Sequence, residues 1–207
     1  MKLRIAKQSD YKILAKIHIE CGKEQTGGFM FKLGLPFLKL YYKILLKEKH
    51  SIVLIAEDEN DLVIGFVSGS ISAEEHLKKL RDNKYYLAFS VLPSIIKSPK
   101  ILKSLIERNS FIHSKKQSKQ FGITSGVRME YWAWKPTEKG ALSIYLIKAW
   151  LNIIFSLGHT TVKGEVDLIN DGILKIHKFL GAKVKNELNN DDGKKRVIIE
   201  YVNPNSK

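Results

Sequence analysis

The chain contains a single cysteine, Cys21, among its 207 residues. One cysteine cannot form an internal disulfide, and it cannot build a cysteine-based metal cluster. Both exclusions fit a reducing, intracellular setting, and we predict no metal site.

Long apolar runs are also lacking. The first ten residues turn polar after a short start, so they lack the apolar core of a signal peptide. The longest apolar stretch, residues 141–157, is interrupted by Ser143, Lys148, Asn152 and Ser156. A membrane-spanning helix needs a longer and more continuous apolar segment. We therefore expect a cytoplasmic protein without a membrane span.

Acidic residues are fewer than basic residues. Against 35 Lys and Arg there are 21 Asp and Glu, which gives a net charge of +14. Such a surface attracts anions such as nucleotide phosphates, nucleic acid or lipid headgroups. Much of the excess is lysine on predicted helix faces, where simple solvation is a sufficient explanation. The charge alone leaves these alternatives open.

The first half of the chain alternates strand and helix patterns. A strand at 2–6 is followed by a helix from about Asp10, and a second amphipathic helix covers 37–47. The β-branched runs at 51–57 and 62–70 predict an antiparallel hairpin. Residues 73–125 are predicted as a helical insertion, in which Pro93 breaks an apolar piece and 114–125 forms a mobile loop.

The second half has a sharper pattern. We predict a strand at 128–135 stopped by Pro136, a buried helix at 140–157, a strand at 161–166 and a short helix at 171–180 closed by Gly181. Two last strands, 183–188 and 196–202, pair across an Asn/Asp/Gly-rich turn at 189–193. The expected fold is α/β: one domain, 1–207, with a mixed central sheet of about six to seven strands flanked by helices.

Two segments of the second half contain candidate functional residues. The sequence KPTEKGALS at 135–143 leads from a strand into the apolar helix. Further on, Asn170, Leu180 and Gly181 frame a short helix that contains His177. The order of elements and the spacing of these two segments resemble the GCN5-related N-acetyltransferase (GNAT) family, although the first segment keeps only one of that family's glycines.

The resemblance implies an acyl-CoA N-acyltransferase that uses acetyl-CoA and no metal. In the family, amides at the start of the helix hold the CoA pyrophosphate, because unpaired N–H groups and the helix dipole favour an anion. Backbone N–H groups of the preceding strand polarise the acyl carbonyl. The residues that the resemblance assigns to acetyl-CoA are Ala133, Trp134, Lys135, Thr137, Glu138, Lys139, Gly140, Ala141, Leu142, Ser143 and Asn170.

The resemblance also places His177 where the family has a tyrosine that protonates the leaving thiolate. An imidazolium with a pKa near ~6.5 is a suitable acid for this step. A histidine at a helix rim without a chemical role is the other interpretation. For the base, the candidates are Glu130, Glu165 and Glu57, and Glu130 leads because it shares the strand of the expected acyl site.

The acceptor is predicted to be a primary amine of a small molecule. A Gly-Phe and Leu-Gly pattern at 27–42 is similar to one in GNAT proteins of surface-sugar biosynthesis, which suggests an amino sugar attached to a nucleotide. The alternative is a catalytically degenerate GNAT-like module that binds a nucleotide, nucleic acid or a protein partner, though no nucleic-acid motif is present. Membrane-surface attachment through the helix at 37–47 and a homodimer also stay open.

Overall fold

The computed structural model describes residues 1–24, 29–102, 105, 122–138, 140–189 and 195–206. A seven-stranded sheet has the order β1-β2-β3-β4-β5-β7-β6, and only β4 and β5 run parallel. This sheet confirms the predicted mixed architecture. The strands are β1 (Lys2–Ile5), β2 (Ser51–Glu57), β3 (Val63–Ser70), β4 (Arg128–Trp134), β5 (Thr161–Asp167), β6 (Lys183–Asn189) and β7 (Lys195–Val202).

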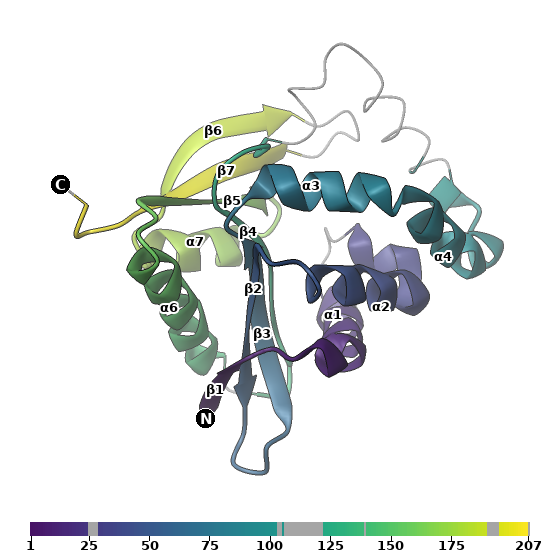
Figure 1. Cartoon of the computed structure of the whole chain (residues 1–207), viewed down its shortest axis with the longest axis horizontal. Helices are drawn as coiled ribbons and strands as arrows, with labels where there is room; N and C mark the ends of the chain where they lie inside the picture. The colour runs from purple at the N-terminus through teal and green to yellow at the C-terminus, as the bar shows by residue number, and fades with distance from the viewer. Residues whose placement is uncertain (25–28, 103–104, 106–121, 139, 190–194, 207) are drawn as a thin grey trace.

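Helices cover both faces of the sheet (Figure 1). One face carries α1 (Tyr11–Glu24) and α2 (Gly34–Leu45), each preceded by a short 3-10 turn, η1 (Gln8–Asp10) and η2 (Met30–Leu33). The other face carries α6 (Ala141–Ser156) and α7 (Asp171–Phe179). Between β3 and β4 the chain forms α3 (Ala73–Asp82) and α4 (Lys84–Lys97), within the stretch predicted to be a helical insertion.

Each face of the sheet has its own apolar core. Beneath α6 and α7, the fully buried Trp150 packs on the sheet, and its indole N–H donates to Ile52 O at 2.9 Å. Beneath α1 and α2, the core includes Tyr42 and Phe66, whose rings meet edge to face. Because the apolar side chains of α2 belong to this core, the membrane attachment considered for the helix at 37–47 is wrong.

Gly69 on β3 lets Trp150 approach the sheet, and its replacement gives a first testable prediction. A Cβ atom at Gly69 would lie 2.3 Å from Trp150 Cζ2 and 2.6 Å from Arg128 O. Overpacking of this kind costs about 1–3 kcal/mol, so Gly69→Ala should lower the urea midpoint of unfolding. Gly172→Ala is the matched control, because a Cβ there meets nothing within 4 Å. Equal midpoints for the two variants would contradict the close packing.

Two helices differ from the sequence prediction. Helix α4 continues through Pro93, which was expected to break it. Pro93 is on the exposed side of the helix, where water can satisfy the carbonyl that loses its N–H partner. Helix α2 starts at Gly34, so Pro36 lies in its first turn, where a missing N–H costs nothing.

Two predicted loops are only partly described. Of the loop at 114–125, residues 114–121 lie outside the described residues, whereas Ile123 is buried against Ile198. Residues 190–193 of the turn between β6 and β7 also lie outside them. None of the helices in the described part of the chain has the length and hydropathy that crossing a bilayer requires.

Candidate active site

The parallel strands β4 and β5 separate soon after they meet. They pair only at Arg128↔Lys163 and Met129↔Gly164, and in these described strands no pair follows toward the carboxyl ends. Backbone groups on the facing edges of residues 130–134 and 165–167 are therefore not paired with each other; we call this place the unpaired edge. The carboxyl ends of parallel strands are where α/β sheets commonly bind ligands.

The direction of the β4 backbone follows from its ladder with β3. Lys135 N–H donates to Ile64 O at 2.9 Å. Antiparallel pairs alternate between bonded and non-bonded, so Ala133, opposite Phe66, also directs its backbone groups to β3. Trp134 faces the unpaired edge instead, and its carbonyl accepts a hydrogen bond from Cys21 Sγ at 3.0 Å. The sequence prediction for the Ala133 amide is therefore corrected, and Trp134 N–H is the donor left for a ligand.

Two indole groups on β4 lack hydrogen-bond acceptors. The side chains of Trp132 and Trp134 both pack into the core beneath α6 and α7. Both Nε1 atoms are buried and have no hydrogen-bond partner. A buried donor without an acceptor costs free energy, and a carbonyl or amide oxygen of a ligand at the unpaired edge would satisfy it. The two indole N–H groups are thus buried donors without an acceptor among the described residues.

The turn from β4 into α6 leaves a helix start open. Glu138 N–H donates to Lys135 O at 3.0 Å, and Thr137, Gly140 and Ala141 are exposed. No side chain caps α6, and a Cβ on Gly140 would meet nothing within 4 Å. The amides of the first turn are therefore accessible to an anion. Half-buried Glu138 is the negative charge nearest to this turn in sequence.

Three more residues predicted for this loop have other placements. Ser143 is buried, and its hydroxyl donates to Gly140 O at 2.5 Å, so this side chain closes the turn instead of facing a ligand. Leu142 is half-buried. Lys139 lies outside the described residues.

His177 lies in the core rather than at a helix rim. Its side chain is buried, its Nδ1 lies 2.5 Å from the Tyr201 hydroxyl, and its ring meets Trp132 edge to face. Burial lowers the pKa of His177 to about 4. The ring is therefore neutral near pH 7, unlike the imidazolium expected from the sequence. Asn170 begins the same helix and is half-buried, and its side chain forms no cap hydrogen bond.

A β-bulge places Glu130 on the opposite face of β4. Tyr131 pairs with Ser68 and Met129 with Gly69, so Glu130 is the additional residue of the strand. A bulge re-aims a side chain, and here it directs Glu130 toward α3. Arg128 lies between two carboxylates, with Nε 3.4 Å from Glu130 Oε2 and Nη2 3.6 Å from Glu165 Oε1. Burial opposes the charge of Arg128, but Glu130 and Glu165 outweigh it and raise the pKa.

Glu130 also belongs to a line of three titratable groups. His76 of α3 has Nδ1 2.9 Å from Glu48 Oε2 and Nε2 3.9 Å from Glu130 Oε1. Burial would lower the pKa of His76, yet the hydrogen bond with Glu48 and the charge of Glu130 raise it above the usual value. Five buried polar atoms of this region lack a hydrogen-bond partner: Glu48 Oε1, His76 Nε2, Arg128 Nε, Glu130 Oε1 and Glu165 Oε1.

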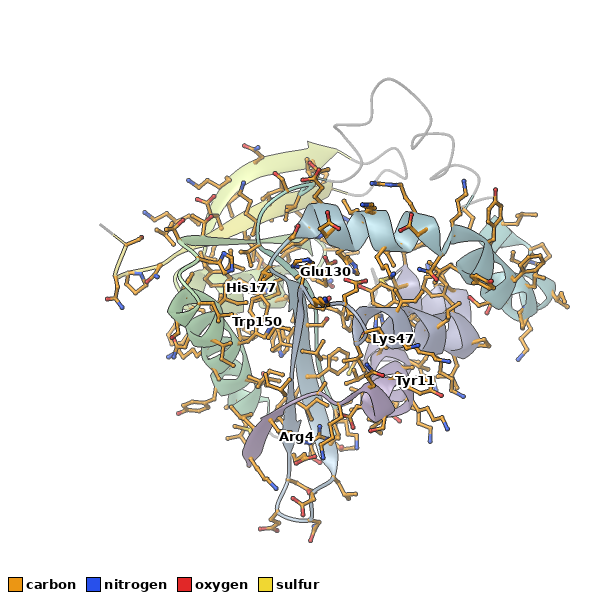
Figure 2. All side chains as sticks on the ribbon, in the orientation of Figure 1. Arg4, Tyr11, Lys47, Glu130, Trp150 and His177 are labelled. Carbon is orange, nitrogen blue, oxygen red and sulfur yellow. The ribbon has the colours of Figure 1, made fainter. Side chains whose placement is uncertain are left out.

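The sequence prediction grouped three glutamates, and the structure brings two of them together. Glu57 lies at the other end of the sheet, opposite Val63, and its Oε1 accepts a hydrogen bond from Arg4 Nε at 2.6 Å. Figure 2 shows Arg4 near the foot of the sheet and Glu130 near its top. Glu57 as a base is therefore wrong. Glu48 and His76 were missed, because neither belongs to a recognisable motif.

No family model matches the chain, and no curated protein matches it. Solved structures match over nearly their whole lengths. A ribosomal-protein-alanine N-acetyltransferase from Brucella melitensis is 11% identical, with a TM-score of 0.61 over 98% of this chain and 100% of that one. A Salmonella typhimurium protein described as a candidate acetyltransferase, solved with its cofactor acetyl-CoA, is 10% identical, with a TM-score of 0.59 over 100% and 96%.

A chimera built on the spermidine N-acetyltransferase of Vibrio cholerae is 12% identical, with a TM-score of 0.58 over 98% of this chain and 96% of that one. Among the described residues, no group of three His, Cys, Asp or Glu side chains could hold a metal ion. At such identities the likeness establishes the architecture, and the chain therefore has the GNAT N-acetyltransferase fold.

Proposed function

We propose that the protein transfers an acetyl group from acetyl-CoA to a primary amine of a small molecule. The observation that carries this proposal is the early end of the β4–β5 ladder. It leaves the Trp134 N–H unpaired beside two buried indole donors, with the open start of α6 immediately after β4. Acetyl-CoA supplies the activated thioester. The chain supplies hydrogen-bond donors on β4 along the length of acetyl-CoA, and backbone amides at the start of α6 for the pyrophosphate of acetyl-CoA.

Glu130 accepts the proton from the amine in this proposal. An ammonium must lose a proton before its nitrogen can attack, and a nearby carboxylate both attracts the ammonium and takes that proton, directly or through water. Glu130 Oε1 is buried and accepts no hydrogen bond, although His76 Nε2 lies 3.9 Å away, and this oxygen is the one assigned to the proton. His76 and Glu48 continue the line away from the acyl site. Glu165 adds a second carboxylate around Arg128.

His177 serves the leaving thiolate from the other face of β4. Glu130 and His177 lie on opposite sides of this strand, because Glu130 points toward α3 while His177 contacts Trp132 beneath α7. A neutral ring that accepts from Tyr201 at Nδ1 carries its hydrogen at Nε2. That N–H stabilises the thiolate by hydrogen bonding as the C–N bond forms and the C–S bond breaks. The second proton of the attacking nitrogen then passes to this thiolate, since thiol pKa values are near ~8.5.

Within small amines, we propose an amino sugar carried on a nucleotide as the first acceptor to assay. The net charge of +14 favours a substrate that bears phosphates, while carboxylate oxygens that accept no hydrogen bond suit its amine. Spermidine and an alanine-terminated peptide are the informative comparisons, because proteins with this fold are named for these acceptors. Turnover of one class above the others identifies the acceptor.

Thermal unfolding with acetyl-CoA tests the proposal. A ligand at about 100 times its Kd stabilises the folded state by roughly 2.7 kcal/mol, which raises the Tm of a chain of this size by about 5–10 °C. Gly140→Glu should reduce the shift, because a carboxylate at the start of α6 repels the pyrophosphate. Gly140 is exposed, so this variant should fold normally.

An absence of any shift at millimolar acetyl-CoA would refute the acetyltransferase proposal. A shift without turnover of any amine would instead assign the protein to the alternative class, a non-catalytic module with the same fold.

A further inference from the structure

Helix α4 is apolar on both sides, but only one side is covered. Its inner side packs on α2 and η2: Val91 is buried, and Ser94 Oγ donates to Leu33 O at 2.9 Å. Gly34, with φ +88°, allows this approach, since a Cβ there would lie 2.2 Å from Ser94 Oγ. The helix is therefore held firmly against the protein, and its outer side has a defined orientation.

The outer side of α4 exposes large apolar residues in one row. Tyr85, Phe89, Leu92 and Ile96 recur at intervals of four, three and four, which places them on the same face of a helix. With the neighbouring Tyr86, their side chains are 47–81% exposed. Figure 1 shows α4 at the edge of the molecule, far from α6 and α7. A patch of this kind marks an interaction surface.

The charges around this face select its partner. Lys84 and Lys97 flank the row at its two ends, and no Asp or Glu occurs between Asp82 and Glu107. A basic helix with aromatic residues on its apolar side is suited to the boundary of an anionic bilayer, where tyrosine rings lie at headgroup level. We propose that α4 docks the protein reversibly on an anionic lipid surface.

A second copy of the chain fits this face less well. In a two-fold dimer the same patch meets itself, so the lysines of one copy would approach those of the other, and α4 itself carries no carboxylate to lie between them. A lipid surface provides the missing negative charge. The helix has 14 residues, a length of roughly 21 Å, and it lies along the surface instead of crossing it.

Vesicle co-sedimentation of the whole protein tests this proposal. At low salt we expect binding to phosphatidylcholine vesicles that contain phosphatidylglycerol, and little binding to phosphatidylcholine alone. Phe89→Ser with Ile96→Ser should weaken binding about tenfold or more, because both side chains lose their burial in the interface. Lys84→Gln with Lys97→Gln should weaken it about fivefold per lysine at low salt, and this loss should shrink at high salt.

The matched control is Phe179→Ser with Ile169→Ser, which removes two comparably exposed apolar residues, one at the end of α7 and one in the turn before it. This variant should bind vesicles as the parent protein does. The proposal is overturned if the parent does not sediment with anionic vesicles, or if both double serine variants bind equally. It is also overturned if Phe89→Ser with Ile96→Ser changes only the oligomeric state in analytical ultracentrifugation, which would assign the face to a second copy.

Discussion

Glu130→Gln is expected to lower kcat about 100-fold, the lower end of what a positioned general base contributes. The substitution keeps the shape of the side chain and removes its basicity. The acetyl-CoA thermal shift should be unchanged, because Glu130 lies on the α3 face of β4, away from the start of α6. Initial rates and thermal shifts measured on the same preparation separate these two effects.

The dependence of this deficit on pH makes the test specific. As the pH approaches the pKa of the free amine, more acceptor arrives already deprotonated, and the need for a base falls. The deficit of Glu130→Gln should therefore shrink as the pH rises from 7 toward 9. Glu57→Gln is the matched control: it breaks the pair with Arg4 and should lower stability without lowering kcat. Equal rates for Glu130→Gln and the parent would remove Glu130 as the base.

A loss of stability in mild acid is the second large effect. Burial lowers the pKa of His18 to about 3 and that of His177 to about 4, whereas an unfolded histidine titrates near ~6.5. Below pH 6.5 the unfolded chain therefore binds more protons than the folded one, and stability falls as the pH falls. Between pH 6.5 and 4 we expect each ring to remove about 3 kcal/mol from the free energy of unfolding.

His76 acts in the opposite direction. Its raised pKa gives stability that is present below pH 6.5 and lost as the pH rises through the folded value. It therefore offsets part of the loss caused by His18 and His177. Urea denaturation at half-unit steps from pH 7 to pH 4 measures the sum.

A variant isolates the contribution of His177 to the pH dependence of stability. His177→Asn keeps an acceptor near the position of Nδ1 for the Tyr201 hydroxyl and removes the titration. The variant should be less stable at pH 7 because packing is lost. Its free energy of unfolding should then fall less steeply toward pH 4, with a slope that corresponds to about one bound proton fewer. Parallel declines for the variant and the parent would show that His177 does not titrate in this range.

Local pattern predicted most of the fold. The strands at 51–57 and 128–135 and the helix at 140–157 have strong periodicity, and all three are present within a residue or two. The larger of the two exceptions among the helices, α4, was expected to break at Pro93. The sequence shows that Pro93 removes a hydrogen bond of the helix. It does not show that Val91 and Ser94 pack on neighbouring segments and hold the helix in place.

The site was harder to predict because it depends on contacts between distant segments. Spacing identified the helix of His177, but its burial against Tyr201 comes from a strand 24 residues away. The line from Glu48 through His76 to Glu130 joins the connection after α2, helix α3 and strand β4, which are spread over more than 80 residues. Glu57 and Glu130 look alike in sequence, and their long-range partners, Arg4 for Glu57 and His76 for Glu130, distinguish them.

The short β4–β5 ladder has a mechanical consequence as well as a chemical one. It divides the sheet into a block of β1, β2, β3 and β4 and a block of β5, β7 and β6, joined by two residue pairs. The amide of Lys163, bonded to Val127 O at 3.0 Å across this junction, has few neighbouring bonds to protect it. Such a seam opens at lower free energy than the interior of either block, and a molecule bound across it would slow hydrogen exchange there first.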